Sequence, residues 1–132
     1  MFRYLTSLFA IATFAAFAEP ADAETELMMA EEPGCIWCAR WNTEIGTIYD
    51  KTGEGAAAPL RKVDVTAPLP EDITLARGVN FTPTFILLID GSEAARLEGY
   101  PGEDFFWGLL GQMLADQNIP FELKTDASAG QG

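Results

Sequence analysis

Two cysteines separated by two residues, Cys35 and Cys38, lie where the pattern of the chain changes from strand to helix. Residues 26–30 are typical of a short strand. From Cys35 onward apolar residues recur at helical spacing: Trp37, Cys38, Trp41, Ile45 and Ile48. Both sulfurs then lie in a first helical turn, where free N–H groups and the helix dipole favour a thiolate. A thiolate attacks disulfides and a second, deeper thiol resolves the product, so we assign Cys35 as nucleophile and Cys38 as resolving residue.

Three other uses of this cysteine pair remain open. A purely structural disulfide would close a loop of only four residues, which is worth about 2 kcal/mol by chain entropy. A haem attachment site needs a histidine after the second cysteine, where this chain has Ala39. Half of a zinc site would need a second subunit to supply the other ligands. The strand before the motif and the helix after it favour the redox interpretation.

The 132 residues contain no histidine, which excludes many kinds of site. Nucleophiles activated by a histidine base are excluded, and so are zinc sites built on imidazole. Two cysteines are too few for a four-thiolate zinc or iron–sulfur site, so we expect no metal and no cofactor. The formal net charge of −12 disfavours nucleic acid and favours a partner with a basic docking surface.

The first 23 residues have the pattern of a secretory signal peptide. Arg3 precedes an apolar run over residues 5–18, shorter than the ~20 residues of a membrane-spanning helix. Small residues allow cleavage after Ala18 or Ala23, and the intervening proline favours the second. Export permits disulfides, and the simple bacterial form of the signal indicates the periplasm.

The rest of the chain predicts one α/β domain over residues 24–116 and a polar, disordered tail over 117–132. After the first strand and helix, residues 53–58 are expected to form a small-residue loop. The later elements are expected to be a strand over 60–65, a short helix over 70–78, a buried strand over 85–89, a hairpin turn at Asp90-Gly91, a returning strand over 93–98 and a last helix after Gly102. The order is therefore strand, helix, strand, helix, strand, strand, helix.

With this order, residues 26–115 resemble the thioredoxin-fold family, and Thr82-Pro83-Thr84-Phe85 is a second mark of it. The alternative is an ordinary loop proline before a strand. The resemblance implies a four-stranded mixed sheet with helices on both faces. It also implies that Pro83 is a cis-proline packed near the disulfide and that the backbone of Thr82 binds an extended substrate. Gly99 matches the glycine that this family places beside the active site.

The chain also departs from the family pattern. Met29 stands where cytosolic thioredoxins have a buried aspartate used in proton transfer, and solvated turn residues such as Glu31 or Glu32 are poor substitutes. Gly34 replaces the tryptophan that usually precedes the first cysteine. Two indoles lie near the motif instead. We expect one, Trp41, in the core, and we place the other, Trp37, with Gly34 among the residues that contact substrate.

More narrowly, the chain resembles the exported thioredoxin-like accessory proteins of bacterial sulfur-oxidation clusters. The residues that carry this resemblance are 34–38, 58–60 and 99–107. It implies a thiol–disulfide reductase that keeps cysteines of exported proteins reduced, including that of a sulfur carrier, with electrons from a membrane thiol transporter. Because the sequence has no heptad pattern and no third cysteine, we expect a monomer. Two other functions stay open: a Cu(I)-binding module that adds Met28 or Met29 to the cysteines, and a redox-inactive interaction domain.

Overall fold

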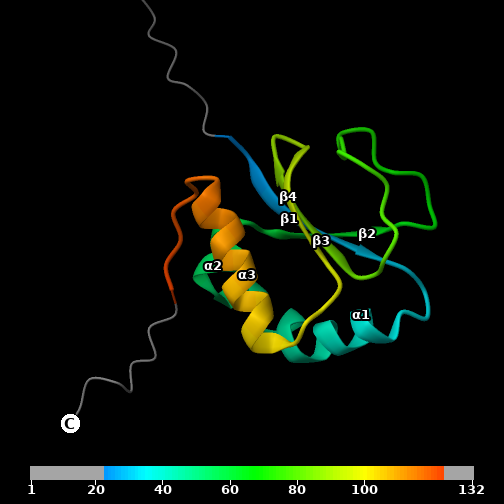
Figure 1. Cartoon of the computed structure of the whole chain (residues 1–132), viewed down its shortest axis with the longest axis horizontal. Coiled ribbons are helices and arrows are strands. Elements are labelled where there is room, and N and C mark those ends of the chain that lie inside the picture. The colour runs from blue at the N-terminus through cyan, green and yellow to red at the C-terminus, as the bar shows by residue number, and fades with distance from the viewer. Residues whose placement is uncertain (1–22, 124–132) are drawn as a thin grey trace, which may run out of the picture.

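The computed structural model describes residues 23–123, which form a sheet with helices packed against it (Figure 1). The predicted signal peptide up to residue 22 and residues 124–132 of the predicted tail lie outside the described residues. The four strands are β1 Thr25–Glu31, β2 Leu60–Asp64, β3 Thr84–Ile89 and β4 Ser92–Glu98, in the order β2-β1-β3-β4. This is the four-stranded mixed sheet of the thioredoxin fold, and all four predicted strands are present.

Strand β1 lies inside the sheet, parallel to β2 and antiparallel to β3. Residues 27–30 and 84–88 are buried on both faces, because these two central strands are covered by chain on either side. The hairpin between β3 and β4 turns at Asp90 and Gly91, with φ angles of 50° and 79°. Two consecutive left-handed residues match the twist of a two-residue hairpin, so the predicted turn is confirmed.

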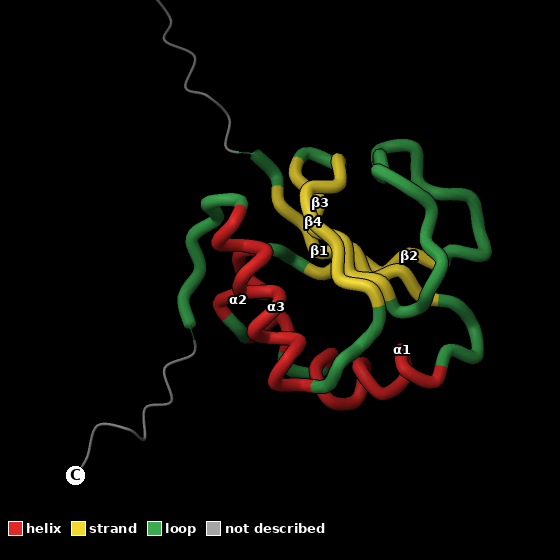
Figure 2. Tube along the Cα trace, viewed as in Figure 1, coloured by secondary structure: helices red, strands yellow, loops and turns green. Residues whose placement is uncertain are grey.

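Three helices lie on one side of the sheet: α1 Ile36–Trp41, α2 Gly53–Ala57 and α3 Glu103–Asp116 (Figures 1 and 2). Helix α1 continues into a π-helical turn, η1 Asn42–Gly46, and a 3₁₀ turn follows, η2 Tyr49–Lys51. The larger core fills the space between these helices and the sheet, with Trp41 fully buried in it. The Trp41 ring lies 5.3 Å from that of Phe85 and 5.7 Å from that of Phe106, which confirms Trp41 as a core residue.

The other face of the sheet is covered by a long loop between β2 and β3, so the predicted helix over 70–78 is wrong (Figure 2). The described helices therefore cover one face of the sheet, whereas helices were expected on both faces. Thr74 instead pairs with the start of β4: its N–H donates to Gly91 O at 2.8 Å, and its C=O accepts from Glu93 N at 2.9 Å. This extended course directs Ile73 and Leu75 into a second core, which contains Met28 and Ile86. Pairing with β4 therefore outweighs the proline and acidic residues that favour a helix start.

Buried charges hold this loop against β4. The side chains of Arg96 and Glu93 are only 5% and 6% exposed, and Arg96 donates to both Glu93 oxygens at 2.7 and 2.9 Å. The same guanidinium donates to the carbonyls of Arg77 and Gly78, and Glu93 accepts from Ala76 N at 2.7 Å. Arg96 and Glu93 therefore hold the backbone of residues 76–78 in place of helical hydrogen bonds.

Two further expectations are corrected on the helical side. Residues 53–57 form helix α2 rather than a loop, because the Thr52 hydroxyl caps it by accepting from Gly55 N at 3.0 Å. The packed chain also extends beyond residue 116, since Ile119 and Phe121 pack against the larger core. A Cβ on Gly53 would lie 1.7 Å from the carbonyl oxygen of Glu122, so α2 and the C-terminal segment lie backbone against backbone.

Within residues 23–123 no helix is long and apolar enough to cross a membrane.

Candidate active site

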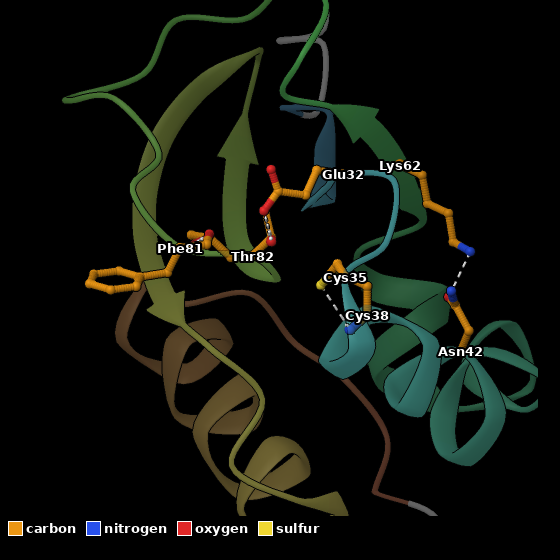
Figure 3. Close-up of a disulfide and its surroundings, with 8 residues drawn as sticks. Glu32, Cys35, Cys38, Asn42, Lys62, Phe81 and Thr82 are labelled. Atoms are coloured by element: carbon orange, nitrogen blue, oxygen red, sulfur yellow. Dashed lines mark hydrogen bonds between the residues drawn. A yellow bond between two sulfur atoms is a disulfide. The ribbon is translucent and has the colours of Figure 1, made fainter.

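Cys35 and Cys38 form a disulfide at the start of α1 (Figure 3). Cys35 is the N-cap residue of the helix, and its sulfur accepts a hydrogen bond from Cys38 N at 3.1 Å. Cys35 is half-buried, whereas Cys38 is 4% exposed and belongs to the larger core. The first sulfur therefore combines access from solvent with a backbone N–H that stabilises negative charge, and the second sulfur is shielded.

The turn before the disulfide leaves it uncovered. Cys35 N donates to the carbonyl of Glu32 at 3.3 Å, which closes the turn between β1 and α1. Gly34, inside this turn, is exposed with φ of +78°, in the left-handed region that favours glycine. Apart from its chain neighbours, no atom lies within 4 Å of the position where its Cβ would be, so the space around Gly34 is open.

A hollow of about 360 Å³ lies beside the motif, lined by Trp37, Phe81, Thr82, Glu98 and Gly99. It brings together three of the five predicted substrate-contacting residues from three separate parts of the chain. The Thr82–Pro83 peptide bond is cis, as the resemblance implies, and Pro83 is buried. The carbonyl of Pro83 accepts from Gly99 N at 2.8 Å, which joins this segment to the end of β4. Gly34 does not line the hollow.

Trp37 does not belong to the buried face of the helix, although its spacing matches that face. Its side chain is 51% exposed, and the guanidinium of Arg40 lies 5.7 Å from the ring centroid. A second hollow, of about 240 Å³, lies on Trp37 as well, lined also by Arg40, Tyr100, Pro101 and Gly102. Trp37 thus forms part of two neighbouring depressions beside the disulfide.

A hydrogen-bonded chain fixes Arg40 next to this tryptophan. The Arg40 Nε donates to Glu44 Oε1 at 2.7 Å, and the hydroxyl of Tyr100 donates to the other Glu44 oxygen. The Tyr100 and Arg40 hydrogen bonds hold the pKa of Glu44 below its ordinary value. Burial, followed by the Glu44 carboxylate, raises the pKa of Tyr100. Arg40 therefore forms an ion pair with Glu44, which offsets its positive charge.

Replacement of Tyr100 by Phe should raise the pKa of Glu44 towards its ordinary value, because the variant lacks the hydrogen bond with the largest effect on it. A carboxyl with a lowered folded-state pKa stabilises the fold above its unfolded pKa, and this contribution is lost as pH falls through the folded value. The Tyr100→Phe variant should therefore lose less stability on acidification. Carboxyl titration of Glu44 by NMR measures the change directly, and an unaltered Glu44 pKa would contradict the role given to Tyr100.

Met29 takes the place of the buried aspartate of cytosolic thioredoxins. Met29 is fully buried in the cluster that contains Cys38. Lys62, its register partner on β2, donates to the side-chain oxygen of Asn42 at 2.7 Å (Figure 3). Met28 packs on the opposite face of the sheet, so the two thioethers do not share a face. Within residues 23–123 no group of three His, Cys, Asp or Glu side chains could hold a metal ion.

Among the residues missed from the sequence are Phe81 and Glu98, which line the hollow beside Trp37, and Glu32. Phe81 is 61% exposed and lines the hollow beside Trp37. Glu32, dismissed as a solvated turn residue, accepts a hydrogen bond from the hydroxyl of Thr82 at 2.7 Å (Figure 3). An aromatic residue outside any periodic segment, directly before Thr82-Pro83, is a signal that could have revealed Phe81. No feature of the sequence around Glu32 indicates this hydrogen bond, because its partner, Thr82, lies 50 residues further along the chain.

Comparison with known proteins agrees with this geometry. A similar solved structure is that of the periplasmic thioredoxin SoxS from Paracoccus pantotrophus in its reduced form, with 50% sequence identity and a TM-score of 0.70. The match covers 71% of this chain and 99% of that chain. No protein-family model matches the chain, and no curated protein matches it. The shared fold, the identity over the whole length of SoxS and the Cys35–Cys38 pair show that the chain belongs to the thioredoxin family as a relative of SoxS, with a thiol–disulfide redox function.

Proposed function

We propose that this protein is a periplasmic thiol–disulfide reductase that keeps cysteines of exported proteins reduced, among them the cysteine of a sulfur-carrier protein of sulfur oxidation. The observation that carries the proposal is the difference between the two sulfurs. The half-buried Cys35 sulfur accepts the Cys38 N–H, and the Cys38 side chain is almost fully buried. The periplasmic location and the sulfur-oxidation partner rest on the relationship to SoxS and on the predicted signal peptide.

The reaction starts from the reduced protein. The Cys35 thiolate attacks one sulfur of a substrate disulfide, forms a mixed disulfide and releases the other substrate sulfur as a thiolate. Cys38 then loses its proton to solvent and attacks Cys35, so that the substrate leaves as a second thiolate. Two electrons pass to the substrate and the Cys35–Cys38 disulfide forms. A membrane thiol transporter would return two electrons to this disulfide and complete the cycle.

The hollow beside the disulfide gives this reaction a binding surface. Trp37 and Phe81 supply exposed aromatic rings, and Thr82 supplies a backbone open to an extended segment. The hydrogen bond from Gly99 N to the carbonyl of Pro83 holds that backbone at the end of the sheet. The bare Gly34 turn on the other side of the motif lets a protein surface approach Cys35.

The charges around Cys35 favour electron donation over disulfide formation. The two residues between the cysteines, Ile36 and Trp37, carry no charge. Arg40 is paired with Glu44, and the turn before Cys35 adds the carboxylate of Glu32, which accepts from the Thr82 hydroxyl. The helix N-terminus is thus the main influence that stabilises the Cys35 thiolate, and a less stabilised thiolate means a more reducing couple.

The direction of electron flow is tested with two protein substrates. The reduced protein should reduce the disulfides of insulin in the presence of dithiothreitol. The oxidised protein should install disulfides in reduced ribonuclease A much more slowly than a strong oxidant of the same fold. Faster oxidation of ribonuclease than reduction of insulin would contradict the reductase assignment. Loss of both reactions would contradict the proposed function itself.

A further inference from the structure

Glu32 connects the two halves of the site through two different atoms. Its main-chain carbonyl accepts from the N–H of Cys35 at 3.3 Å, and its side-chain carboxylate accepts from the hydroxyl of Thr82 at 2.7 Å. Figure 3 shows the Glu32 carboxylate reaching from the end of β1 to the hydroxyl of Thr82, in the surroundings of the disulfide. One residue therefore spans from the nucleophile's turn to the segment before Pro83.

The segment that receives this bond is anchored on both sides of Thr82. The carbonyl of Phe81 accepts from the hydroxyl of Thr84 at 2.6 Å, and the carbonyl of Pro83 accepts from Gly99 N at 2.8 Å. In contrast, neither the N–H nor the C=O of Thr82 has a hydrogen-bond partner among residues 23–123. Unpaired backbone groups of this kind are the ones that an extended peptide can bind. The side chain of Thr82 is held while its peptide groups stay open.

We propose that Glu32 is a positioning residue for the substrate: its hydrogen bond to the Thr82 hydroxyl holds the open peptide groups of Thr82 at a fixed distance and orientation from Cys35. This inference rests on the proposed function and deepens it. The bond joins the Glu32 carboxylate to Thr82 and involves neither cysteine. Its loss should therefore weaken binding of an extended peptide and leave the sulfur chemistry unchanged. A small disulfide, which lacks a peptide backbone, gains nothing from it.

The test compares two substrates in single-turnover reactions of the reduced protein. The first is an extended peptide whose central cysteine forms a mixed disulfide with thionitrobenzoate, and the second is the uncharged 2-hydroxyethyl disulfide. Glu32→Ala and Thr82→Val should each raise the half-saturating peptide concentration about fivefold, the effect of one net hydrogen bond. For Glu32→Ala, the maximal rate with the peptide and the rate with the small disulfide should stay at wild-type values.

Two further variants separate positioning from charge and from general damage. Glu32→Gln keeps an acceptor for the Thr82 hydroxyl and should restore near wild-type peptide binding. The double variant Glu32→Ala/Thr82→Val should cost no more than either single change, because both remove the same bond. Glu31→Ala is the matched control, since its side chain makes no hydrogen bond among the described residues, and it should leave peptide binding unchanged.

Backbone order parameters of residues 79–82, measured by ¹⁵N NMR relaxation, give a readout independent of turnover, and they should fall in Glu32→Ala and Thr82→Val but not in Glu32→Gln. Equal peptide binding by wild type and Glu32→Ala would overturn this inference while the proposed function stands, and so would parallel losses with both substrates. A reduced wild-type protein that reacts with neither disulfide would overturn the proposed function, and this inference with it.

Discussion

Replacement of Cys35 by Ser should reduce the rate of protein disulfide reduction by a factor on the order of 10³ or more. A serine hydroxyl does not ionise near neutral pH, so the N–H of Cys38 and the helix terminus have no thiolate to stabilise. The fold should persist, because Cys35 is half-buried and the two side chains differ by one atom. The measurement is insulin reduction, with circular dichroism and thermal unfolding as controls for the fold.

Cys38→Ser is the matched variant, because it removes the resolving thiol and leaves the nucleophile in place. The first attack should proceed, and the reaction should stop at a stable mixed disulfide between Cys35 and the substrate, detectable by mass spectrometry. If Cys38→Ser loses the first attack, or if Cys35→Ser forms the adduct through Cys38, the assignment of the two sulfurs is reversed.

Replacement of Arg96 by Ala should produce the largest loss of stability among the charged residues, about 3 kcal/mol, or roughly 15 °C in Tm for a domain of this size. The variant leaves the Glu93 carboxylate buried without its partner, with its side chain only 6% exposed. It also removes the donors to the carbonyls of Arg77 and Gly78, which hold the loop that covers one face of the sheet.

Arg77→Ala is the control for that variant. Arg77 pairs with Glu98 on the surface, with side chains 60% and 35% exposed, and exposed pairs contribute under about 1 kcal/mol. Urea unfolding followed by tryptophan fluorescence compares the two free energies of unfolding. Similar losses in Arg77→Ala and Arg96→Ala would contradict the clamping role of Arg96.

The strands were predictable because their signals are local. The continuous apolar run in β3, the Asp90-Gly91 turn and the alternating pattern of β2 each specify their own backbone. The segment 70–78 was mispredicted because its helix-start signals are local. The hydrogen bonds that decide its conformation are not local: Thr74 bonds to the hairpin at the start of β4, and Arg96 of β4 bonds to the carbonyl of Arg77. The C-terminal boundary was set too early for a similar reason: Phe121 packs against distant parts of the chain.

In the active site too, some features could be predicted from the sequence and others could not. The motif around Cys35, the Thr82-Pro83 pair and Gly99 could be read from the sequence because residue type and spacing carry them. The hollow that joins Trp37 with Phe81 could not, because it depends on how β4, α1 and the 81–83 segment pack. Helical spacing also placed Trp37 on the buried face, yet its side chain is 51% exposed, whereas that of the adjacent Cys38 is buried in the larger core.

The reduction potential of the Cys35–Cys38 couple distinguishes a reductase from a protein that forms disulfides. It is measured by equilibrating the protein with glutathione buffers of known ratio and quantifying the free thiols. Because Ile36 and Trp37 carry no charge and Arg40 is paired with Glu44, we expect a reducing couple, nearer about −270 mV than the −120 mV or so of strong oxidants. A potential above about −150 mV, or a Cys35 pKa near about 4, would contradict it and would assign the protein to disulfide formation.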